Sequence, residues 1–349
     1  MHKLKKKILV VLSILLALYV VGSVVAVQII YATVFVRVPP QAISAFPLYR
    51  DVAQEYPREE VSFLSGENRL TGWVYGEDND DALVVMAHGL GSTAESYLPY
   101  AIWFVDQGYR VFSYDATGTG ASEGEDTTGL SQSVLDLDSA LTYIESNPEL
   151  SELPVLLFGH SWGGYAVARV LAYDHDITAS VSISAFDTPM DMVCEAAEEY
   201  CGPFAYGGYP FLYLQQRILF ADAANGSAAE AVEASGIPIL VIHGTADEVI
   251  SYEEASLLSY LEEGDNVTLL TLDGEDHMSL LEPQGEVYTT YVNACHAQYE
   301  LLWDQYGGVI PEEVQAAHYA AIDKSITGGV NEDLAAQIDA FYRQALSGK

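Results

Sequence analysis

Residues 159–164 read GHSWGG and place Ser161 between an apolar run and a helix-like run. A serine on a sharp turn from strand to helix adopts strained backbone angles, so the residues two before and two after it must be small. Gly159 and Gly163 occupy these two positions. The start of the following helix points N–H groups at charge that develops on a substrate oxygen. The spacing therefore predicts that Ser161 is a nucleophile.

Two residues later in the chain supply the base and the acid that a serine nucleophile needs. A serine hydroxyl attacks well only when a neutral imidazole takes its proton, and His277 suits this task. Asp247 would orient the imidazole and stabilise its charged form. Glu248 or Asp187 could serve instead, which would leave Asp247 as a turn residue. We predict a triad of Ser161, His277 and Asp247.

A second glycine-containing segment, residues 88–91 (HGLG), ends another apolar run. Its glycines let the chain turn tightly enough to aim the N–H of Leu90 at the same oxyanion as the N–H of Trp162. Loss of one such donor typically costs about 10²–10³ in rate. We predict an oxyanion hole formed by Leu90 and Trp162, and a structural role for His88.

Strand-like and helix-like patterns alternate from about residue 60 onward and must position these groups. Strands are expected at 70–76, 82–88, 109–115, 154–159, 178–185, 238–243 and 266–272, and helices at 127–147, 162–173 and 251–263. Several strands are near-continuous apolar runs, which is typical of parallel strands covered on both faces. The alternation predicts an α/β fold with a doubly wound, mostly parallel sheet. Helices are expected over 284–349, the last of them capped by Asn331.

Together these motifs resemble the α/β-hydrolase superfamily, and most of all its exported bacterial serine esterases and serine-aminopeptidase-like members. The match runs from about residue 60 to the C-terminus, and the chain order Ser161, Asp247, His277 is the order of that family. Residues 114–122 (YDATGTGAS) are similar to its glycine-rich loop after strand four, but Thr117 replaces the usual arginine. The resemblance implies the α/β-hydrolase fold.

Residues 187–236 interrupt the alternation with an aromatic-rich stretch that contains no strand-like run. Its position after a strand favours a lid over a pocket, in which Tyr206, Tyr209 and Phe211 would contact the substrate. The alternative is a packed helical pair that closes one edge of the sheet.

The N-terminal region has no charged residue from Ile8 to Val36, and four lysines precede this run. Twenty residues that rise about 1.5 Å each span a hydrocarbon core of about 30 Å. The positive-inside rule keeps the lysines in the cytoplasm, so the rest of the chain lies outside the cytoplasmic membrane. A cleaved signal peptide, with Val24 and Ala26 before the cut, would instead give a secreted protein. We predict a basic tail, an anchor, a linker and a hydrolase domain at 1–7, 8–30, 31–57 and 58–349.

The charge is strongly and unevenly acidic, with a formal net charge of −36 and all 50 acidic residues after residue 50. Such a field repels nucleic acid and anionic headgroups, so neither is expected to bind the main domain. It serves solubility or, alternatively, attracts a cationic substrate. Cys194 and Cys201 can bridge only if the chain turns before Gly202, and Cys295 is expected in the core. The histidines show no metal-ligand spacing, so we expect no metal and no cofactor.

These features predict hydrolysis of an ester, or of an amide, through an acyl-enzyme on Ser161. The aromatic insertion and the scarcity of bases favour an uncharged, partly apolar acyl substrate. An aminopeptidase-like enzyme is a second hypothesis, with Glu195, Glu198 or Glu199 binding an ammonium group. An acyltransferase and a catalytically silent surface binding module complete the alternatives. The sequence does not set the oligomeric state.

Overall fold

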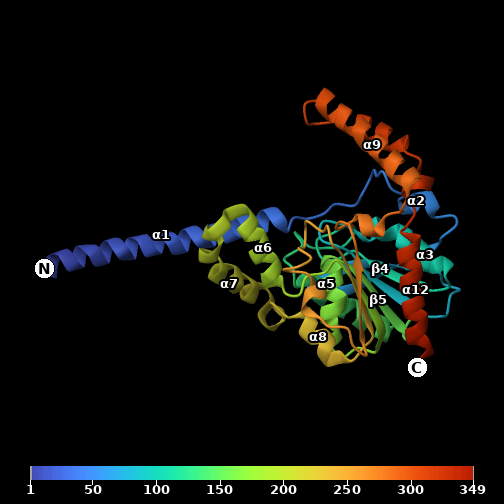
Figure 1. Cartoon of the computed structure of the whole chain (residues 1–349), viewed down its shortest axis with the longest axis horizontal. Helices are drawn as coiled ribbons and strands as arrows, with labels where there is room; N and C mark the ends of the chain where they lie inside the picture. The colour runs from blue at the N-terminus through green and yellow to red at the C-terminus, as the bar shows by residue number, and fades with distance from the viewer. Residues whose placement is uncertain (1, 349) are drawn as a thin grey trace.

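The computed structural model describes the backbone of residues 2–348, and the side chains of these residues other than 2, 199–201, 203 and 204. A long helix, α1 (His2–Val34), extends from one side of a sheet-containing body, and a helical arm that includes α9 projects from the body elsewhere (Figure 1). The short helix α2 (Tyr49–Val52) lies between α1 and the sheet in sequence.

The body is built on one eight-stranded sheet in the order β1-β2-β4-β3-β5-β6-β7-β8. β1 and β2 are antiparallel, β2 pairs antiparallel with β4, and all the other pairs are parallel. The strands are Arg58–Ser65, Asn68–Tyr75, Leu83–Ala87, Arg110–Tyr114, Val155–His160, Ile177–Ile183, Ile239–Gly244 and Val267–Leu272. The mostly parallel sheet and the seven expected strands are confirmed, and β1 is a strand that the pattern missed.

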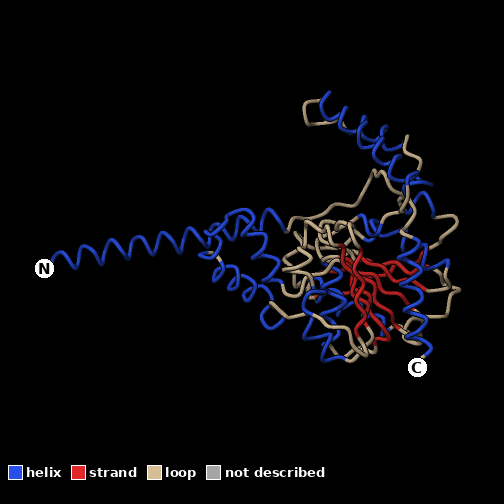
Figure 2. The backbone as a smooth tube through the Cα atoms, in the orientation of Figure 1, coloured by secondary structure: helices blue, strands red, loops and turns tan. Residues whose placement is uncertain are grey.

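Helices cover both faces of the sheet, as a doubly wound fold requires (Figure 2). One apolar cluster contains side chains of α3 (Leu98–Asp106) and α12 (Glu332–Ser347). The other contains side chains of α4 (Gln132–Ser146), α5 (Trp162–Arg169) and α8 (Ala228–Ser235). The side chain of Asn331 accepts a hydrogen bond from the N–H of Leu334, which confirms the predicted cap of α12.

The predicted helix at 251–263 is wrong, because this stretch forms turns and a short 3₁₀ helix at Leu257–Tyr260. Its backbone is engaged elsewhere: the N–H of Leu257 donates to the carbonyl of Ala185 at 2.7 Å, and Ser256 bridges Phe186. These contacts pull the chain against the end of β6, so tertiary pairing overrides the local helical preference.

The stretch 187–236 forms a helical hairpin, α6 (Pro189–Cys201) and α7 (Tyr209–Phe220), followed by α8. Cys194 in α6 is a free cysteine, so it takes no part in the bridge considered from the sequence. The C-terminal arm contains α9 (Glu286–Gln305), α10 (Glu312–Ala320) and α11 (Lys324–Thr327). Cys295 is only half-buried on α9, not in the core as expected.

The last turns of α1 belong to the body. Val27, Tyr31 and Phe35, spaced by four residues, are buried in the same cluster as α4 and α5. The boundary predicted at residue 30 therefore falls inside a continuous helix. Beyond it, Arg37 donates hydrogen bonds to three carbonyls of the loop after β4, and Val38 bridges Thr119.

Candidate active site

Ser161 occupies the sharp turn between β5 and α5, with φ 57° and ψ −117°. Such a left-handed conformation is rare outside glycine and marks local strain. The structure also shows why its neighbours are small. A Cβ on Gly159 would lie 2.2 Å from the carbonyl oxygen of Gly163, and one on Gly163 would lie 2.0 Å from that of Ala87. We call residues 159–163 the elbow.

Asp247 and His277, which are 30 residues apart in the chain, meet at the ends of β7 and β8. The Nδ1 atom of His277 lies 2.7 Å from Oδ2 of Asp247. The other carboxylate oxygen accepts the N–H groups of Val249 and Ile250 at 2.9 Å each. His243 adds a contact from Nε2 at 3.1 Å. The carboxylate is thus fixed by four donors and aimed at the imidazole.

The charge state of Asp247 follows from these contacts. Burial by itself would raise the pKa of this carboxyl, but the hydrogen bonds from His243 and His277 outweigh it and hold the pKa well below its usual range. Asp247 is therefore an anion at neutral pH. A buried anion bonded to Nδ1 stabilises an imidazolium, which is what proton transfer from a serine requires.

His277 is held against the elbow by the residue next to the serine. The main-chain oxygen of His277 accepts from Nε2 of His160 at 2.8 Å, and the two rings lie 4.8 Å apart. Within the described part of the chain, the Ser161 hydroxyl has no hydrogen-bond partner. Serine–histidine bonds are often long before substrate binds. The structure joins His277 to Asp247 and places His277 against the residue next to Ser161, and the link from Ser161 to His277 stays a prediction.

No motif in the sequence indicates that Tyr97 joins this group. Its hydroxyl accepts the N–H of Gly89 at 3.1 Å and lies 2.7 Å from Nδ1 of His160. Since Nε2 of His160 donates to the His277 carbonyl, Nδ1 must accept from Tyr97 when the ring is neutral. Burial, followed by the nearby His277, lowers the pKa of His160 to about 3 and keeps it neutral. This relay connects the loop at 88–91 to the base.

The two amides of the predicted oxyanion hole have no acceptor in the described structure. The loop at 88–91 passes beside the serine, since a Cβ on Gly89 would lie 3.5 Å from Cβ of Ser161. Leu90 makes no hydrogen bond among the described residues. Trp162 is the first residue of α5, so its N–H has no partner within the helix. Its indole is fixed by a bond to the carbonyl of Leu130 at 2.6 Å.

The loop after β4 is organised without the arginine of the resembling family. Thr117 donates both its N–H and its hydroxyl to the buried carboxylate of Asp136, at 2.7 and 2.9 Å. The Nε2 atom of His88 accepts the N–H of Ala116 at 3.0 Å, which agrees with a structural role for this histidine. The loop therefore supports the 88–91 segment through hydrogen bonds rather than through a salt bridge.

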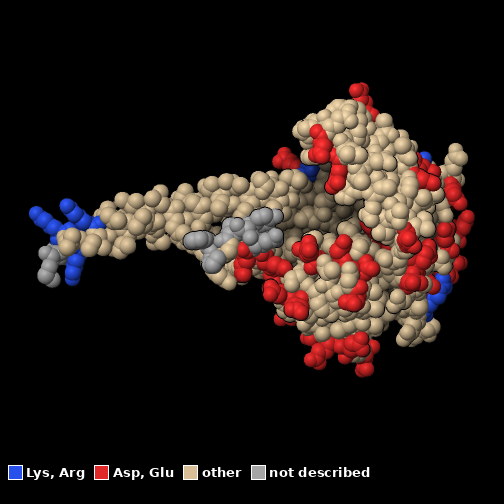
Figure 3. Space-filling view, turned by 45° about the horizontal axis from the view of Figure 1, so that its top comes forward, with Lys and Arg blue, Asp and Glu red and all other residues tan. Residues whose placement is uncertain are grey.

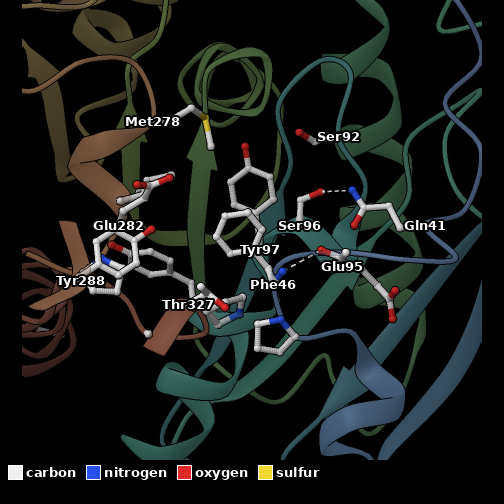
Figure 4. Close-up of a pocket in the computed structure, with 17 residues that line it drawn as sticks. Gln41, Phe46, Ser92, Glu95, Ser96, Tyr97, Met278, Glu282, Tyr288 and Thr327 are labelled. Atoms are coloured by element: carbon white, nitrogen blue, oxygen red, sulfur yellow. Dashed lines mark hydrogen bonds between the residues drawn. The ribbon is translucent and has the colours of Figure 1, made fainter. Parts of the chain in front are cut away.

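A cavity of about 250 Å³ lies behind Tyr97 and next to Met278, which follows the candidate base (Figure 4). Its walls come from the segment before α2, from α3 and from the start of α9. Aromatic and aliphatic side chains dominate them, with Glu95 and Glu282 as the carboxylates. Burial raises the pKa of Glu282. This cavity offers apolar space beside the candidate site.

The predicted lid residues lie away from this cavity. Phe211 packs edge-on against Tyr19 of α1 with ring centroids 5.6 Å apart. Tyr209 donates to Glu198, and Tyr206 is exposed. A substrate role for these three aromatic residues stays a prediction.

A second cavity, of about 380 Å³, is lined by acidic side chains of α6 that include Glu195 and Glu198. Neither Ser161 nor His277 contributes to its lining. Among the residues that the structure describes, no group of three or more His, Cys, Asp or Glu could hold a metal ion.

Comparisons with known proteins show what this chain is similar to. The family model described as serine aminopeptidase S33 matches residues 78–222. The chain is 25% identical over 237 residues to the uncharacterized protein YfhR of Escherichia coli O157:H7. The aligned region covers 66% of this chain and 77% of YfhR. It is 31% identical over 131 residues to polyketide transferase af380 of Aspergillus fumigatus, or 36% of this chain and 45% of that protein.

Among solved structures, esterase Pf2001 of Pyrococcus furiosus aligns with a TM-score of 0.53 at 20% identity, covering 70% of this chain and 90% of the esterase. This likeness shows a shared fold. The relatives together support a hydrolase. The sheet order and this structural likeness show the α/β-hydrolase fold, and over residues 78–222 the chain is similar to the family described as serine aminopeptidase S33.

Proposed function

We propose that this protein is a membrane-anchored serine hydrolase that cleaves an ester bond through an acyl-enzyme on Ser161. The observation that carries the proposal is the 2.7 Å bond between His277 and a buried, fully bonded Asp247, held beside the strained elbow. A carboxylate–imidazole pair next to a serine on a strained turn is the arrangement that activates a hydroxyl.

Each group has a defined part in the proposed reaction. The Ser161 oxygen attacks the ester carbonyl carbon while Nε2 of His277 takes the hydroxyl proton. The N–H groups of Leu90 and Trp162 stabilise the oxyanion. Collapse of the tetrahedral intermediate expels the alcohol, which receives the proton from His277. Water then repeats the sequence on the acyl-enzyme and releases the acid.

The substrate that fits best is uncharged and partly apolar. The acidic surface repels anionic substrates, and the cavity of Figure 4 presents Phe46, Tyr97 and Tyr100 in its lining. An amide remains the less favoured bond, because an amine is a poorer leaving group than an alcohol.

The anchor in this proposal is α1. Residues Lys3–Val34 form a helix long and apolar enough to cross a membrane by length and composition, a test that signal sequences also pass. We favour an uncleaved anchor because Tyr19, which cleavage after Ala26 would remove, contacts Phe211 of α7. Four lysines at the free end of α1 then remain in the cytoplasm and the body lies outside.

The test is labelling of the purified full chain with a fluorophosphonate probe, with Ser161→Ala as control. Wild type should become labelled and the variant should not. Wild type should also release p-nitrophenol from short acyl esters faster than it cleaves aminoacyl anilides. An unlabelled wild-type protein would leave the silent binding module as the better account, and faster anilide cleavage would favour the aminopeptidase.

Acyl transfer is the second candidate, because an alcohol and water compete for the same acyl-enzyme. A specific observation favours it: one of the relatives is a polyketide transferase. Adding a short alcohol to the esterase assay separates the two reactions. A new ester that accumulates at the expense of the free acid would indicate a transferase.

A further inference from the structure

The α6–α7 hairpin lies beside α1 over a well-defined length of that helix (Figure 1). Tyr19 stacks edge-on against Phe211 and donates its hydroxyl to the carbonyl of Gly207. Further along α1, Gln28 donates to Gln215 at 2.9 Å. The hairpin therefore reaches down α1 from the body as far as Tyr19.

If α1 spans a membrane, the contact between Tyr19 and Phe211 lies too deep in the bilayer for the hairpin to stay in water. The charge-free run starts at Ile8, and the 11 residues from there to Tyr19 rise about 17 Å. A hydrocarbon core is about 30 Å thick. If the lysines stay at the cytoplasmic headgroups, Tyr19 lies about 13 Å below the opposite surface of the core. Tilting α1 only deepens this position, so the hairpin must enter the leaflet on the side of the body.

The surface of α7 suits such a position. Tyr213, Leu214, Ile218 and Leu219 are exposed, and Ile218 is 69% exposed. Acidic side chains are spread over the body (Figure 3), yet none of the 50 acidic residues falls between Tyr200 and Ala221. The one charged residue of α7, Arg217, pairs with Asp222 at 3.4 Å. An acid-free, apolar helix avoids the repulsion that the body would meet at anionic headgroups.

The base of the hairpin touches the candidate site. The N–H of Ser251, four residues after Asp247, donates to the Glu195 carboxylate of α6 at 3.2 Å. Met190 and Val193 pack on the same apolar cluster that includes Trp162. Met190 and Val193 of α6, together with Phe211 of α7, thus connect the hairpin to the apolar cluster beneath the elbow.

We propose that α7 of the α6–α7 hairpin is immersed in the outer leaflet beside α1 and that Ser161 takes its substrate from the bilayer, so the substrate class is a membrane-dissolved, long-chain acyl ester. The substrate part of this inference rests on the proposed serine hydrolase function. The immersion part rests only on the contacts of α1 with α7 and on the composition of α7.

Immersion is tested with the full chain in phosphatidylcholine vesicles that contain nitroxide-labelled lipid. Cys194, Cys201 and Cys295 are first replaced by serine, and a bimane fluorophore is attached at Ile218→Cys. Leu301→Cys on α9 is the matched control, since Leu301 is 70% exposed but lies on the projecting arm. Lipid nitroxide should quench the label at 218 and leave the label at 301 bright. Equal quenching by the lipid nitroxide at the two sites would overturn immersion.

Substrate delivery is tested with Leu214→Glu combined with Ile218→Glu. This variant should hydrolyse a long-chain ester embedded in vesicles at least about tenfold more slowly, because a carboxylate is costly at membrane depth. It should cleave soluble p-nitrophenyl acetate at the wild-type rate. The control variant, Val287→Glu with Leu301→Glu on α9, should match wild type on both esters.

Equal losses on both esters would overturn delivery from the bilayer. A wild type that cleaves neither ester would instead remove the proposed hydrolase function and the substrate class with it. In that case the quenching experiment still decides whether the hairpin is immersed.

Discussion

The elbow and the α6–α7 hairpin meet at the candidate site but are held in place by opposite means. At the elbow, backbone packs on backbone so closely that a single added Cβ would overlap a carbonyl oxygen. On the hairpin, a Cβ added to Gly207 would meet only Tyr19, at 3.4 Å. The elbow is fixed by the body of the protein, whereas the hairpin at Gly207 is fixed by α1.

The elbow therefore provides the geometry for the chemical step, and the hairpin provides the surface along which a substrate enters. A reacting serine must keep its geometry within a fraction of an ångström, and close backbone contacts supply that rigidity. An element that admits an apolar substrate needs an apolar surface and few fixed contacts. Substitutions at the elbow should therefore slow the chemical step or destabilise the fold. Substitutions on the hairpin should leave the fold and the hydrolysis of a soluble substrate unchanged.

The largest expected effect is that of Asp247→Asn. Loss of the anion leaves the imidazole of His277 in the wrong tautomer and without charge stabilisation, which should lower kcat for a soluble ester about 10⁴-fold. Glu248→Gln and Asp187→Asn are controls, because Glu248 is exposed and Asp187 caps α8 through Ala229. A larger loss with either control would move the acid role away from Asp247.

The next largest effect is expected from one of a matched pair of glycine substitutions. Gly163→Ala places a Cβ 2.0 Å from the carbonyl oxygen of Ala87, so the backbone must shift, and the free energy of unfolding should fall by about 2–3 kcal/mol. Gly207→Ala on the hairpin should change it by less than about 0.5 kcal/mol. Urea unfolding measures both values. Similar losses would contradict the proposed contrast between the two regions.

The smallest effect, taken per pH unit, concerns the pH dependence of stability. The pKa of His160 is lowered to about 3 in the folded protein, whereas an unfolded histidine titrates near about 6.5. Between these values the unfolded chain binds a proton that the folded chain does not. The free energy of unfolding therefore falls as the pH falls, by up to about 1.4 kcal/mol per pH unit from this residue.

His160→Gln should reduce that slope between about pH 6.5 and pH 4.5, because glutamine can still donate to the His277 carbonyl but takes up no proton. His296→Gln, at an exposed position on α9, should leave the slope unchanged. Urea titrations at several pH values measure it. An unaltered slope in His160→Gln would mean that His160 is not held neutral.

The sequence predicted the parts of this protein that depend on near neighbours. Continuous apolar runs located the parallel strands, and the GHSWGG spacing located the elbow, because a tight strand-to-helix turn requires small residues at fixed positions. β1 was missed because its core-facing Val61 and Phe63 alternate with Glu60 and Ser62 at a sheet edge, which weakens the apolar signal. The stretch 251–263 was misassigned because the N–H of Leu257 bonds to Ala185 after β6, which leaves the remaining donors to form only turns and a short 3₁₀ helix.

Only the tertiary structure decided which distant groups meet. The relay through Tyr97 and His160 and the position of α7 along α1 both join residues whose separation in the chain carries no pattern. Helical and strand periodicities record which face of an element is buried, and they hold no information about which other element covers that face. The sequence by itself therefore determined the reacting residue types and their order, and folding decided what surrounds them.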